Sequence, residues 1–551
     1  MTAPHVLPDP SALSPAQRAG ALADATADTY DLVVIGAGAT GAGTALDAAS
    51  RGLSVVLVEA GDLADGTSSR SGKTFHGGLR YLEQLNVKLV NQALHERDLM
   101  VNKLCGYLAK PEPFLYPLTR AYERPYIGAG VALYDAMTVS RTGIPHHRHY
   151  SRRGVLRVAP ALDPRRVRGG IQYHDVRVDD ARHTMVLART AASLGVRVLT
   201  RAPVVEVLRD GERVSGVVVA DAATGVRHRI AARAVVNAAG VWSAEIQRLA
   251  GAETFRIAPA KGVHVVLAPD AIDSTTGIFA RAEDSVIIAR KWFDRWMLGT
   301  TDTPYTGDLA TPRAEPAEID YLLRNINRYL ARPVTREHIV GTFAGLRPLL
   351  APAGDADTTS ALSRDHAVIT GPPGMVTIVG GKYTTYRAMA ADAVDAVGAE
   401  LGEPLPRSET ADLPLVGTPG WRSALHRADH LAAAYGLAAG DVTRLAGRYG
   451  ALTEQVLAAD PHLARVVPGT GGHLAAEFAY AVTHEGATTL TDLLWHRTHV
   501  SFETPDGGAT AAPAVAALVA PLLGWTDADT EAQVAAYRAW VTAERAALTA
   551  G

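Results

Sequence analysis

Three absences bound what this sequence can be: it has one cysteine, no excess of either charge and no long apolar run. Cys105 is alone among 551 residues, which excludes an intrachain disulfide and a cysteine-based metal site. The 54 basic and 57 acidic side chains nearly balance, which argues against a protein built mainly to bind nucleic acid. What remains is an ordinary globular composition in a chain long enough for about two to four domains.

No segment predicts a membrane-spanning helix, which needs about 18–20 apolar residues in succession. The nearest, Ala511–Trp525, is shorter and contains Pro513 and Pro521. The start of the chain also lacks the basic residues and apolar core of a signal peptide. It is rich in proline, alanine and aspartate, and we interpret residues 1–29 as a disordered leader, with a short helix as the alternative for part of it.

The clearest local pattern is a strand, a helix and a strand near the start of the chain. An apolar, β-branched run leads into Gly36-x-Gly38-x-x-Gly41, followed by an Ala-rich segment and a second apolar run. Glycines so placed allow a tight turn, close approach of the backbone to a pyrophosphate, and close packing of helix on strand. Glu59 ends the second strand, where a carboxylate accepts hydrogen bonds from ribose hydroxyls. The unit predicts a bound dinucleotide.

The rest of the chain favours FAD over NAD. After the first unit the chain makes a meander of short strands between residues 204 and 230, then returns to the sheet at 235–240 and 376–381, whereas NAD enzymes usually add further βα units. This predicts an α/β fold in which a Rossmann-like FAD-binding domain is interleaved with an antiparallel-sheet substrate domain. We place both within residues 30–410, the substrate (cap) domain mainly over 255–370, and a C-terminal all-α domain over 411–551.

Residues 67–83 (TSSRSGKTFHGGLRYLE), read with the glycine fingerprint, resemble FAD-dependent glycerol-3-phosphate dehydrogenase, the respiratory enzyme. The resemblance continues in order over about residues 30–500. It includes VDDAR at 178–182, NAAGVW at 237–242, KGVH at 261–264, GTTD at 299–302, GLRPL at 345–349, GGKYTTYR at 380–387, EFAYA at 477–481 and TLTD at 489–492.

Together with the fingerprint, the resemblance implies a set of residues that bind FAD. They are Gly36, Gly38, Gly41, Glu59, Thr67, Ser68, Ser69, Lys73, His76, Gly77, Val205, Gly240, Gly381, Lys382 and Thr384. The chain departs from the family at Gly72, where serine or threonine is common. That difference puts one polar contact in doubt.

Oxidation of a secondary alcohol by a flavin needs a hydride acceptor, a base for the hydroxyl proton and a clamp for the substrate. The substrate implied by the resemblance, sn-glycerol 3-phosphate, carries nearly two negative charges, which call for arginine or lysine. We expect it to be bound by Arg80, Tyr81, Arg347, Lys382 and Thr384. A packing role for Tyr81 competes with this interpretation.

Two histidines compete for the role of base, because imidazole titrates near neutrality. His264 lies in a β-like run, and His76 precedes two glycines and could instead lie against the flavin. We favour His264 and keep His76 and Arg347 as further catalytic candidates, since arginine-assisted deprotonation stays open. The histidines at 146, 147 and 149 lack paired carboxylates or a known ligand spacing, and we predict no metal site.

The resemblance implies oxidation to dihydroxyacetone phosphate, with electrons passed to a membrane quinone. An oxygen-using glycerol-3-phosphate oxidase is the nearest alternative, and we find no room for the insertion that family oxidases carry. A sarcosine- or glycine-type amine oxidoreductase is more distant, because one carboxylate would not call for so many basic groups. The intact His264, Arg80, Arg347 and Lys382 argue against a non-catalytic FAD-binding sensor.

Quinone use implies a cytoplasmic protein attached peripherally to the inner face of the cell membrane. Arg97, Lys103, Lys110 and Arg120, interleaved with apolar residues, form either such a contact or a plain solvated helix face. The family also implies a homodimer.

Overall fold

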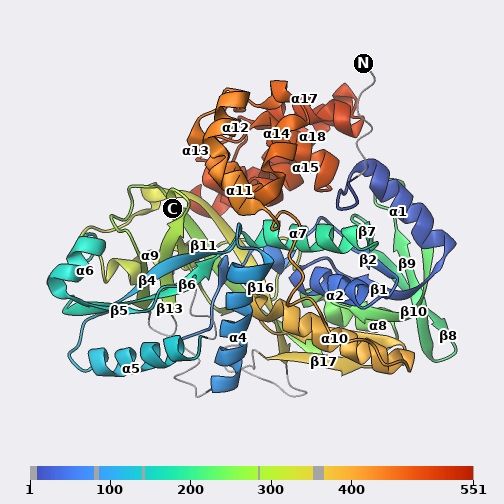
Figure 1. Cartoon of the computed structure of the whole chain (residues 1–551), viewed down its shortest axis with the longest axis horizontal. Coiled ribbons are helices and arrows are strands. Elements are labelled where there is room, and N and C mark those ends of the chain that lie inside the picture. The colour runs from blue at the N-terminus through green and yellow to red at the C-terminus, as the bar shows by residue number, and fades with distance from the viewer. Residues whose placement is uncertain (1–8, 80–85, 139–142, 283–285, 352–364, 550–551) are drawn as a thin grey trace.

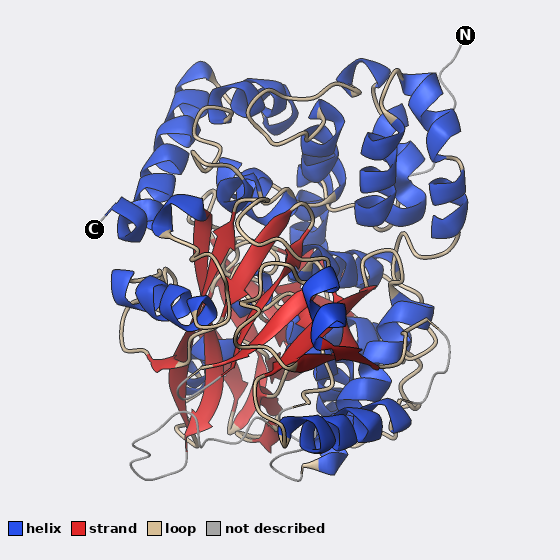
Figure 2. Cartoon of the chain, turned by 90° about the vertical axis from the view of Figure 1, so that its left-hand side faces the viewer, coloured by secondary structure: helices blue, strands red, loops and turns tan. Residues whose placement is uncertain are grey.

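The computed structural model describes residues 9–79, 86–138, 143–282, 286–351 and 365–549. Two β-sheets adjoin in the middle of the molecule, with helices around them (Figure 2). A helical domain, orange to red in Figure 1, covers one side of the junction between the sheets. None of the helices in the described part of the chain has the length and apolar character that crossing a bilayer requires.

The first sheet has a parallel core in the order β18-β10-β1-β2-β7. These strands are β1 (Thr29–Ile35), β2 (Val55–Val58), β7 (Arg197–Leu199), β10 (Arg227–Asn237) and β18 (Met375–Gly380). Antiparallel partners extend it: β17 (His366–Thr370), β8 (Val204–Asp210) and β9 (Arg213–Ala220). Where both faces of the sheet are covered its strands are apolar, as in residues 32–35 of β1 and all of β2.

One face of this sheet packs on helices that the chain contributes far apart in sequence. They are α2 (Ala39–Ser50), α7 (Asp180–Ser193) and α10 (Tyr386–Leu401), and their apolar sides join the sheet in one cluster. The small residues of α2 let it lie close to the sheet. A short turn joins β1 to α2, so the N-terminus of α2 lies at the carboxyl edge of β1.

The second sheet runs in the order β15-β11-β14-β13-β12-β4-β6-β3, with β16 on β11 and β5 on β6. Strands from two parts of the chain form it. The first part contributes β3 (Thr74–Phe75), β4 (Lys110–Leu118), β5 (Arg148–Ser151) and β6 (Gly169–Arg177). The second contributes β11 (Arg256–Leu267), β12 (Gly277–Arg281), β13 (Val286–Trp292), β14 (Arg295–Gly299), β15 (Thr303–Pro304) and β16 (Ile339–Ala351).

The interleaved fold class is confirmed, but the second sheet starts well before the predicted cap, which we placed mainly over 255–370. The strand β4 gives little strand signal, because it carries Pro111, Pro113 and Pro117 and proline is depleted in strands. A helix, α4 (Val87–Leu99), and a π-helical turn at Met100–Leu104 precede β4 in the chain.

The C-terminal domain is all helical, as predicted. It contains α11 (Trp421–His426), α12 (Ala428–Tyr435), α13 (Ala439–Tyr449), α14 (Thr453–Ala458), α15 (Ala475–His484), a π-helix at Asp492–Arg497, α16 (Val500–Glu503), α17 (Ala512–Leu523) and α18 (Asp527–Thr549). Its largest core cluster lies between α15, α17 and α18.

Part of the predicted leader is not disordered, because Pro15–Ala27 forms helix α1, the short helix that we kept as an alternative. Ser14 accepts a hydrogen bond from the amide of Gln17, and the Gln17 side chain accepts one from the amide of Ser14, which makes a capping box with proline at the first helical position. The Arg18 guanidinium then pairs with Asp221 at 2.7 Å and ties the helix to the first sheet.

Candidate active site

A single cavity of about 890 Å³ runs from the carboxyl edge of the parallel strands to the face of the second sheet. Its size falls within the range of about 300–1,000 Å³ that small-molecule sites occupy. The glycine fingerprint lines one end, and His264 and Arg347 line the other. The cavity therefore joins the predicted cofactor site to the predicted substrate site.

The fingerprint end has the geometry that a pyrophosphate needs. Gly36 has φ +100°, and a Cβ there would lie 2.8 Å from the carbonyl oxygen of Ala238. Gly38 ends the turn and precedes α2, whose first amide, that of Ala39, donates to the Ser68 hydroxyl at 2.9 Å. Gly41 lies off the cavity wall, where a Cβ would meet the Gly36 carbonyl oxygen at 1.8 Å; its role is helix–strand packing.

Glu59 lies on the cavity wall at the end of β2. Its carboxylate accepts the amides of Ala37 at 2.7 Å and Gly61 at 2.9 Å. Burial raises the pKa of Glu59 to about 7, and the two amide hydrogen bonds only partly offset this. The turn around the fingerprint thus holds Glu59 in a fixed orientation, as a group that contacts a ribose must be held.

Other residues predicted to bind FAD divide between the wall and the layer behind it. Thr67, Ser68, His76, Gly240, Gly381, Lys382 and Thr384 line the cavity. Ser69, Lys73, Gly77 and Val205 do not. The Gly77 amide donates to the Tyr134 hydroxyl at 2.7 Å, and Val205 lies at an irregularity in the β8–β9 pairing, next to the wall residue Val204.

Lys73 is the clearest departure from the predicted site. Its backbone has φ +52°, and its ammonium is completely buried against Asp180 at 2.5 Å and the Ser69 carbonyl oxygen at 2.9 Å. Asp180 also accepts the Ser71 amide at 2.9 Å. The pair fixes the 67–73 loop from behind, so Lys73 shapes the cavity wall without reaching into it.

The opposite end of the cavity gathers the predicted substrate residues from four separate segments. His264 on β11, Arg347 on β16 and His76 after β3 come from the second sheet, and Lys382 lines the cavity from the segment after β18 of the first sheet. The His76 amide donates to the hydroxyl of Thr384, which also lies on the wall, at 3.2 Å. Arg80 and Tyr81 lie outside the described residues.

His264 is buried, with 7% of its surface exposed, and its ring stacks on Phe343 at 4.8 Å. Burial lowers the pKa of His264 well below its usual value, and the nearby cations of Arg347, Arg290 and Lys73 lower it further. Within the described chain, its Nδ1 has no hydrogen-bond partner. A neutral imidazole in this position can accept a proton.

Acidic side chains fix the cations around His264. Arg347 donates to Asp302 at 3.0 Å and to the Thr301 carbonyl oxygen at 3.1 Å. Gly262 on the paired strand leaves room for the guanidinium, since a Cβ there would lie 2.7 Å from its Nη2. The arginine is thus held across β11, on the wall that it shares with His264.

Arg290 on β13 is a wall residue that the sequence analysis missed. Its side chain is buried and donates to Glu112 at 3.2 Å, to the carbonyl oxygens of Lys291 at 3.2 Å and Lys73 at 3.1 Å, and to the Met297 sulfur at 3.7 Å. The signal in the sequence was the alternation along β13, which places Arg290 on the same face as Ile288. Ile288 is paired with Gly299 on β14, and Gly299 is paired with His264.

The departure from the family pattern at Gly72 also lies on this wall. A Cβ at Gly72 would lie 3.7 Å from Nε2 of His264, an ordinary contact distance. A serine would therefore fit here, with its hydroxyl within reach of the imidazole. The chain leaves that volume open.

The glycine turn and the buried carboxylate of Glu59 fit an adenine dinucleotide. Residues 31–387 match the family model described as FAD dependent oxidoreductase. The chain belongs to the FAD-dependent oxidoreductases. Residues 408–530 match the model described as the C-terminal domain of alpha-glycerophosphate oxidase. The prediction of FAD as cofactor is confirmed.

Relatives extend the likeness over nearly the whole chain. A Mycobacterium tuberculosis protein named glycerol-3-phosphate dehydrogenase 2 is 49% identical over 97% of this chain and 92% of its own length. A Mycobacterium leprae glycerol-3-phosphate dehydrogenase is 48% identical with the same coverage. The structure of a glycerol-3-phosphate dehydrogenase from Bacillus halodurans complexed with FAD has a TM-score of 0.79 at 27% identity, covering 96% of this chain and 98% of that one. The predicted family resemblance is confirmed.

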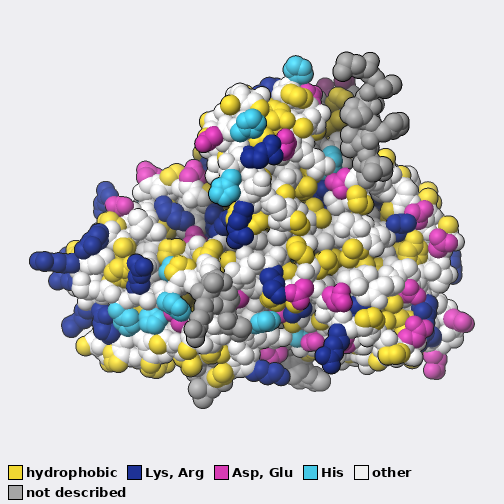
Figure 3. Space-filling view, viewed as in Figure 1, with side chains coloured by type: hydrophobic (Ala, Val, Ile, Leu, Met, Phe, Trp, Pro, Cys, Tyr) yellow, Lys and Arg dark blue, Asp and Glu magenta, His cyan; other side chains and the backbone are white. Residues whose placement is uncertain are grey.

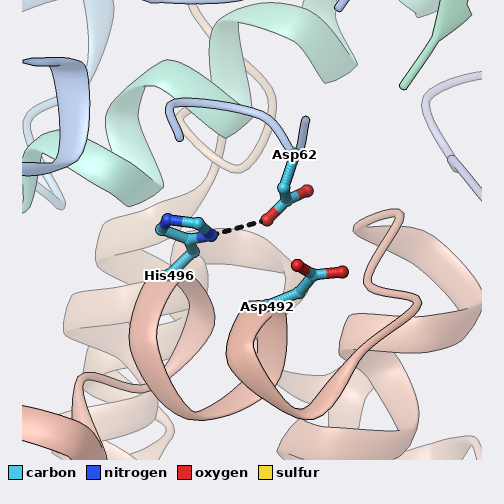
Figure 4. A group of neighbouring side chains, drawn as sticks. All are labelled: Asp62, Asp492 and His496. Atoms are coloured by element: carbon cyan, nitrogen blue, oxygen red, sulfur yellow. Dashed lines mark hydrogen bonds and ion pairs between the residues drawn. The ribbon is translucent and has the colours of Figure 1, made fainter. Parts of the chain in front are cut away.

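Behind the adenine end, a buried charge cluster joins the C-terminal domain to the loop that follows Glu59. Figure 4 shows Asp62 from this loop facing His496 and Asp492 of the π-helix. Arg497 donates to both oxygens of Asp62, at 2.6 and 2.8 Å, and Arg201 donates to both oxygens of Asp492 at 2.7 Å. Arginines thus already neutralise the two carboxylates, and the cluster serves to connect the domains.

Two sequence interpretations of surface groups need correction. The histidine cluster does have a carboxylate partner, since His147 Nδ1 lies 2.7 Å from Asp135. Arg97 is buried and paired with Asp98 and Asp175, and the Lys110 ammonium lies over the Trp421 ring at 4.0 Å. Arg97 therefore belongs to neither surface that the sequence left open, a membrane contact or a solvated helix face, and Lys110 is half-buried.

Proposed function

We propose that this protein oxidises sn-glycerol 3-phosphate to dihydroxyacetone phosphate, with FAD as hydride acceptor and a quinone as the final electron acceptor. The observation that carries the proposal is that His264, Arg347 and Lys382 line the same cavity as the glycine fingerprint. The near full-length identity to proteins named glycerol-3-phosphate dehydrogenase supports the substrate.

The cations select the substrate by its phosphate. A phosphomonoester carries nearly two negative charges, and arginine matches its geometry with two parallel N–H groups. Arg347 is held in place by Asp302 and Thr301, so little reorganisation is needed when the phosphate binds. Lys382 and Thr384 supply further donors from the segment after β18.

His264 acts as the general base in this proposal. It accepts the proton of the C2 hydroxyl, while the hydrogen on C2 leaves as a hydride. FAD, when bound, supplies the acceptor for that hydride. A bound phosphate dianion offsets the surrounding cations and raises the pKa of His264, so the imidazole becomes a stronger base when the substrate is in place.

A peripheral membrane contact would bring the protein to its quinone, and one face of the molecule suits it. Helix α5 (Glu123–Ala136) and the turn before it expose Tyr122, Tyr126 and Leu133, at 60%, 56% and 48%. Next to it, residues 148–168 contain seven arginines, all exposed, and one acidic residue. Figure 3 shows basic side chains gathered at this end of the molecule. Apolar and cationic groups together favour an anionic lipid surface.

Anaerobic titration of the FAD-loaded protein tests the substrate. Glycerol 3-phosphate should bleach the visible flavin band, whereas glycerol, which lacks the phosphate, and sarcosine should leave it unchanged. Bleaching by sarcosine would favour an amine oxidoreductase. Reoxidation of the bleached protein by a quinone, compared with reoxidation by oxygen, then separates the dehydrogenase from the oxidase.

A further inference from the structure

His264 packs against both of the strands that flank β11. It is paired with Gly299 on β14 and with Phe343 on β16. A Cβ at Gly299 would lie 2.1 Å from Cδ2 of His264, so the imidazole lies against the backbone of β14. The same imidazole stacks on Phe343, with an angle of 13° between the two ring planes. These two contacts bound the ring.

No hydrogen bond to Nδ1 orients this imidazole within the described part of the chain. The orientation of a functional histidine is usually set by the hydrogen bond that its second ring nitrogen makes. A catalytic group must nevertheless be held within about 0.5 Å and 10–20° of its productive position by the residues that support it. The orientation of His264 therefore depends on packing, and above all on the Phe343 ring.

The C-terminal domain holds Phe343 in place. The ring of Phe502 on α16 meets that of Phe343 at 5.4 Å, and the ring of Trp495 in the π-helix meets it edge-on at 6.4 Å. Trp495 and Phe502 also contact one another, at 5.3 Å. All three are buried in one apolar cluster and lie off the cavity wall. They form an aromatic layer that supports His264 from outside the cavity.

Close contacts fix Phe502 on the second sheet. A Cβ at Gly341 on β16 would lie 2.6 Å from the carbonyl oxygen of Phe502, so the strand and α16 touch through their backbones. The next residue, Glu503, accepts a hydrogen bond from the indole of Trp292 on β13 at 2.8 Å. Phe502 thus has a defined place relative to the sheet that carries His264.

A buried cation joins the aromatic layer to the cofactor-binding segment. The Lys73 ammonium lies 5.2 Å from the centre of the Phe343 ring and 5.5 Å from that of the Phe502 ring. Aromatic faces attract a cation, most strongly where water is excluded. Lys73 follows the serines of the cofactor loop, Phe343 belongs to the second sheet and Phe502 to the C-terminal domain. Three parts of the chain therefore meet at one ammonium group.

We propose that Phe502 is a positioning residue for His264 and acts through Phe343. The inference rests on the proposed function, in which His264 takes up the proton of the substrate hydroxyl. Phe502 lies off the cavity wall and keeps the Phe343 ring where the imidazole stacks on it. The C-terminal domain then contributes to the oxidation itself, in addition to covering the junction between the sheets.

Truncation of Phe502 tests the inference, with Phe478 as the matched control. Phe478 lies on α15 of the same domain and is equally buried, but it packs in a different apolar cluster from Phe343. In anaerobic stopped-flow experiments with glycerol 3-phosphate, F502A should lower the limiting rate of flavin reduction by about 10–100-fold, because small displacements of a catalytic group are that costly. The substrate concentration that gives half the limiting rate should change by less than about twofold, because the lost contact acts on the transition state. F478A should lower the thermal unfolding temperature and leave the rate unchanged.

A double-mutant cycle with H264N separates positioning of the base from general loosening of the protein. If Phe502 acts through the imidazole, F502A should slow flavin reduction in the wild-type background but not in the H264N background. A merely structural defect would slow both by the same factor. F502L keeps most of the volume of the ring and should recover much of the rate. It replaces F502A in the cycle if F502A loses its FAD.

Three results would overturn the inference: reduction of F502A at the wild-type rate, an equal slowing by F478A, or an equal slowing by F502A in the H264N and wild-type backgrounds. Two other results would fall on the proposed function. If glycerol 3-phosphate fails to bleach the wild-type flavin, the proposed substrate is wrong. If H264N is reduced as fast as wild type, His264 is not the base, and the inference fails with that assignment.

Discussion

Arg290 on the cavity wall and Glu112 behind it form a buried ion pair at 3.2 Å, two strand pairings away from His264. The other guanidinium contacts, to two carbonyl oxygens and a sulfur, engage both of its terminal nitrogens. Arg290 is therefore a resident cation of the wall, held too firmly to close around a substrate. Its charge acts on His264, together with the charges of Arg347 and Lys73.

Removing the Arg290–Glu112 pair should change the pH dependence of catalysis. The double variant R290M/E112Q avoids leaving one buried charge unpaired. It removes one of the cations that lower the pKa of His264, so that pKa should rise. Because the base works unprotonated, the acidic limb of the rate of flavin reduction should move to higher pH. R295M, which removes an arginine that lies on the neighbouring strand and off the cavity wall, should leave the limb in place.

Replacing His264 itself should lower the rate of flavin reduction by about 10²–10⁴-fold, the usual contribution of a general base. H264N keeps a similar volume beside Phe343, so FAD content and thermal stability should change little. Stopped-flow absorbance under anaerobic conditions measures the rate. The exposed His430 provides the control, and reduction of H264N at the wild-type rate would transfer the role of base to another group.

Breaking the contact between Asp62 and Arg497 should loosen both the C-terminal domain and the cofactor. D62N leaves the buried Arg497 without its carboxylate, a change that typically costs about 3–5 kcal/mol. Asp62 belongs to the loop whose neighbours Gly61 and Asp65 line the cavity, so FAD should also dissociate more readily. Thermal unfolding and flavin fluorescence measure the two effects. E454Q, which breaks the exposed pair with Arg427, should change neither.

The same pair predicts a pH dependence of stability. Burial alone would raise the pKa of Asp62, but Arg497 and His496 hold it well below its usual value. In the unfolded chain the pKa of an aspartate is about 3.9, and the stabilisation by ionised Asp62 is fully present above it. This stabilisation is lost as the pH falls toward the lower pKa that Asp62 has in the folded protein. Between about pH 5 and pH 3, wild type should lose more stability than D62N. Parallel losses in the two proteins would contradict this account.

The exposed face of α5 should bind anionic vesicles. Y122S/Y126S/L133S removes three large apolar side chains from the surface, and partial burial of each in lipid contributes about 1 kcal/mol or more. We expect a loss of binding of at least about tenfold in sedimentation with phosphatidylglycerol vesicles. L425S/L522S, which removes exposed leucines of the C-terminal domain, is the control. Equal binding by both variants would place the membrane contact elsewhere.

The cofactor end was predictable because its signal is local. The fingerprint and Glu59 lie in one strand–helix–strand unit, and the folded positions of Gly36 and Glu59 follow from that unit alone. The leader helix, kept only as an alternative to disorder, also had a local signal in Ser14, Pro15 and Gln17. The helix was thus predictable from its cap.

The wall around His264 was less predictable because it depends on pairing between distant strands. Arg290 faces the cavity through the register of β13 on β14, and its partner Glu112 comes from a proline-rich strand far earlier in the chain. Lys73 stands in a family-matching motif, yet its left-handed backbone conformation turns the side chain toward Asp180. No spacing rule in the sequence reveals that turn.

The central claim is that FAD oxidises glycerol 3-phosphate at C2, with His264 as the general base and the cations of the cavity binding the phosphate. Anaerobic stopped-flow absorbance of the FAD-loaded protein, with glycerol 3-phosphate carrying either hydrogen or deuterium at C2, tests it most directly. We predict bleaching of the flavin band, slower with deuterium because the C2–H bond breaks as the flavin is reduced. A flavin band that neither isotopic form changes would contradict the account.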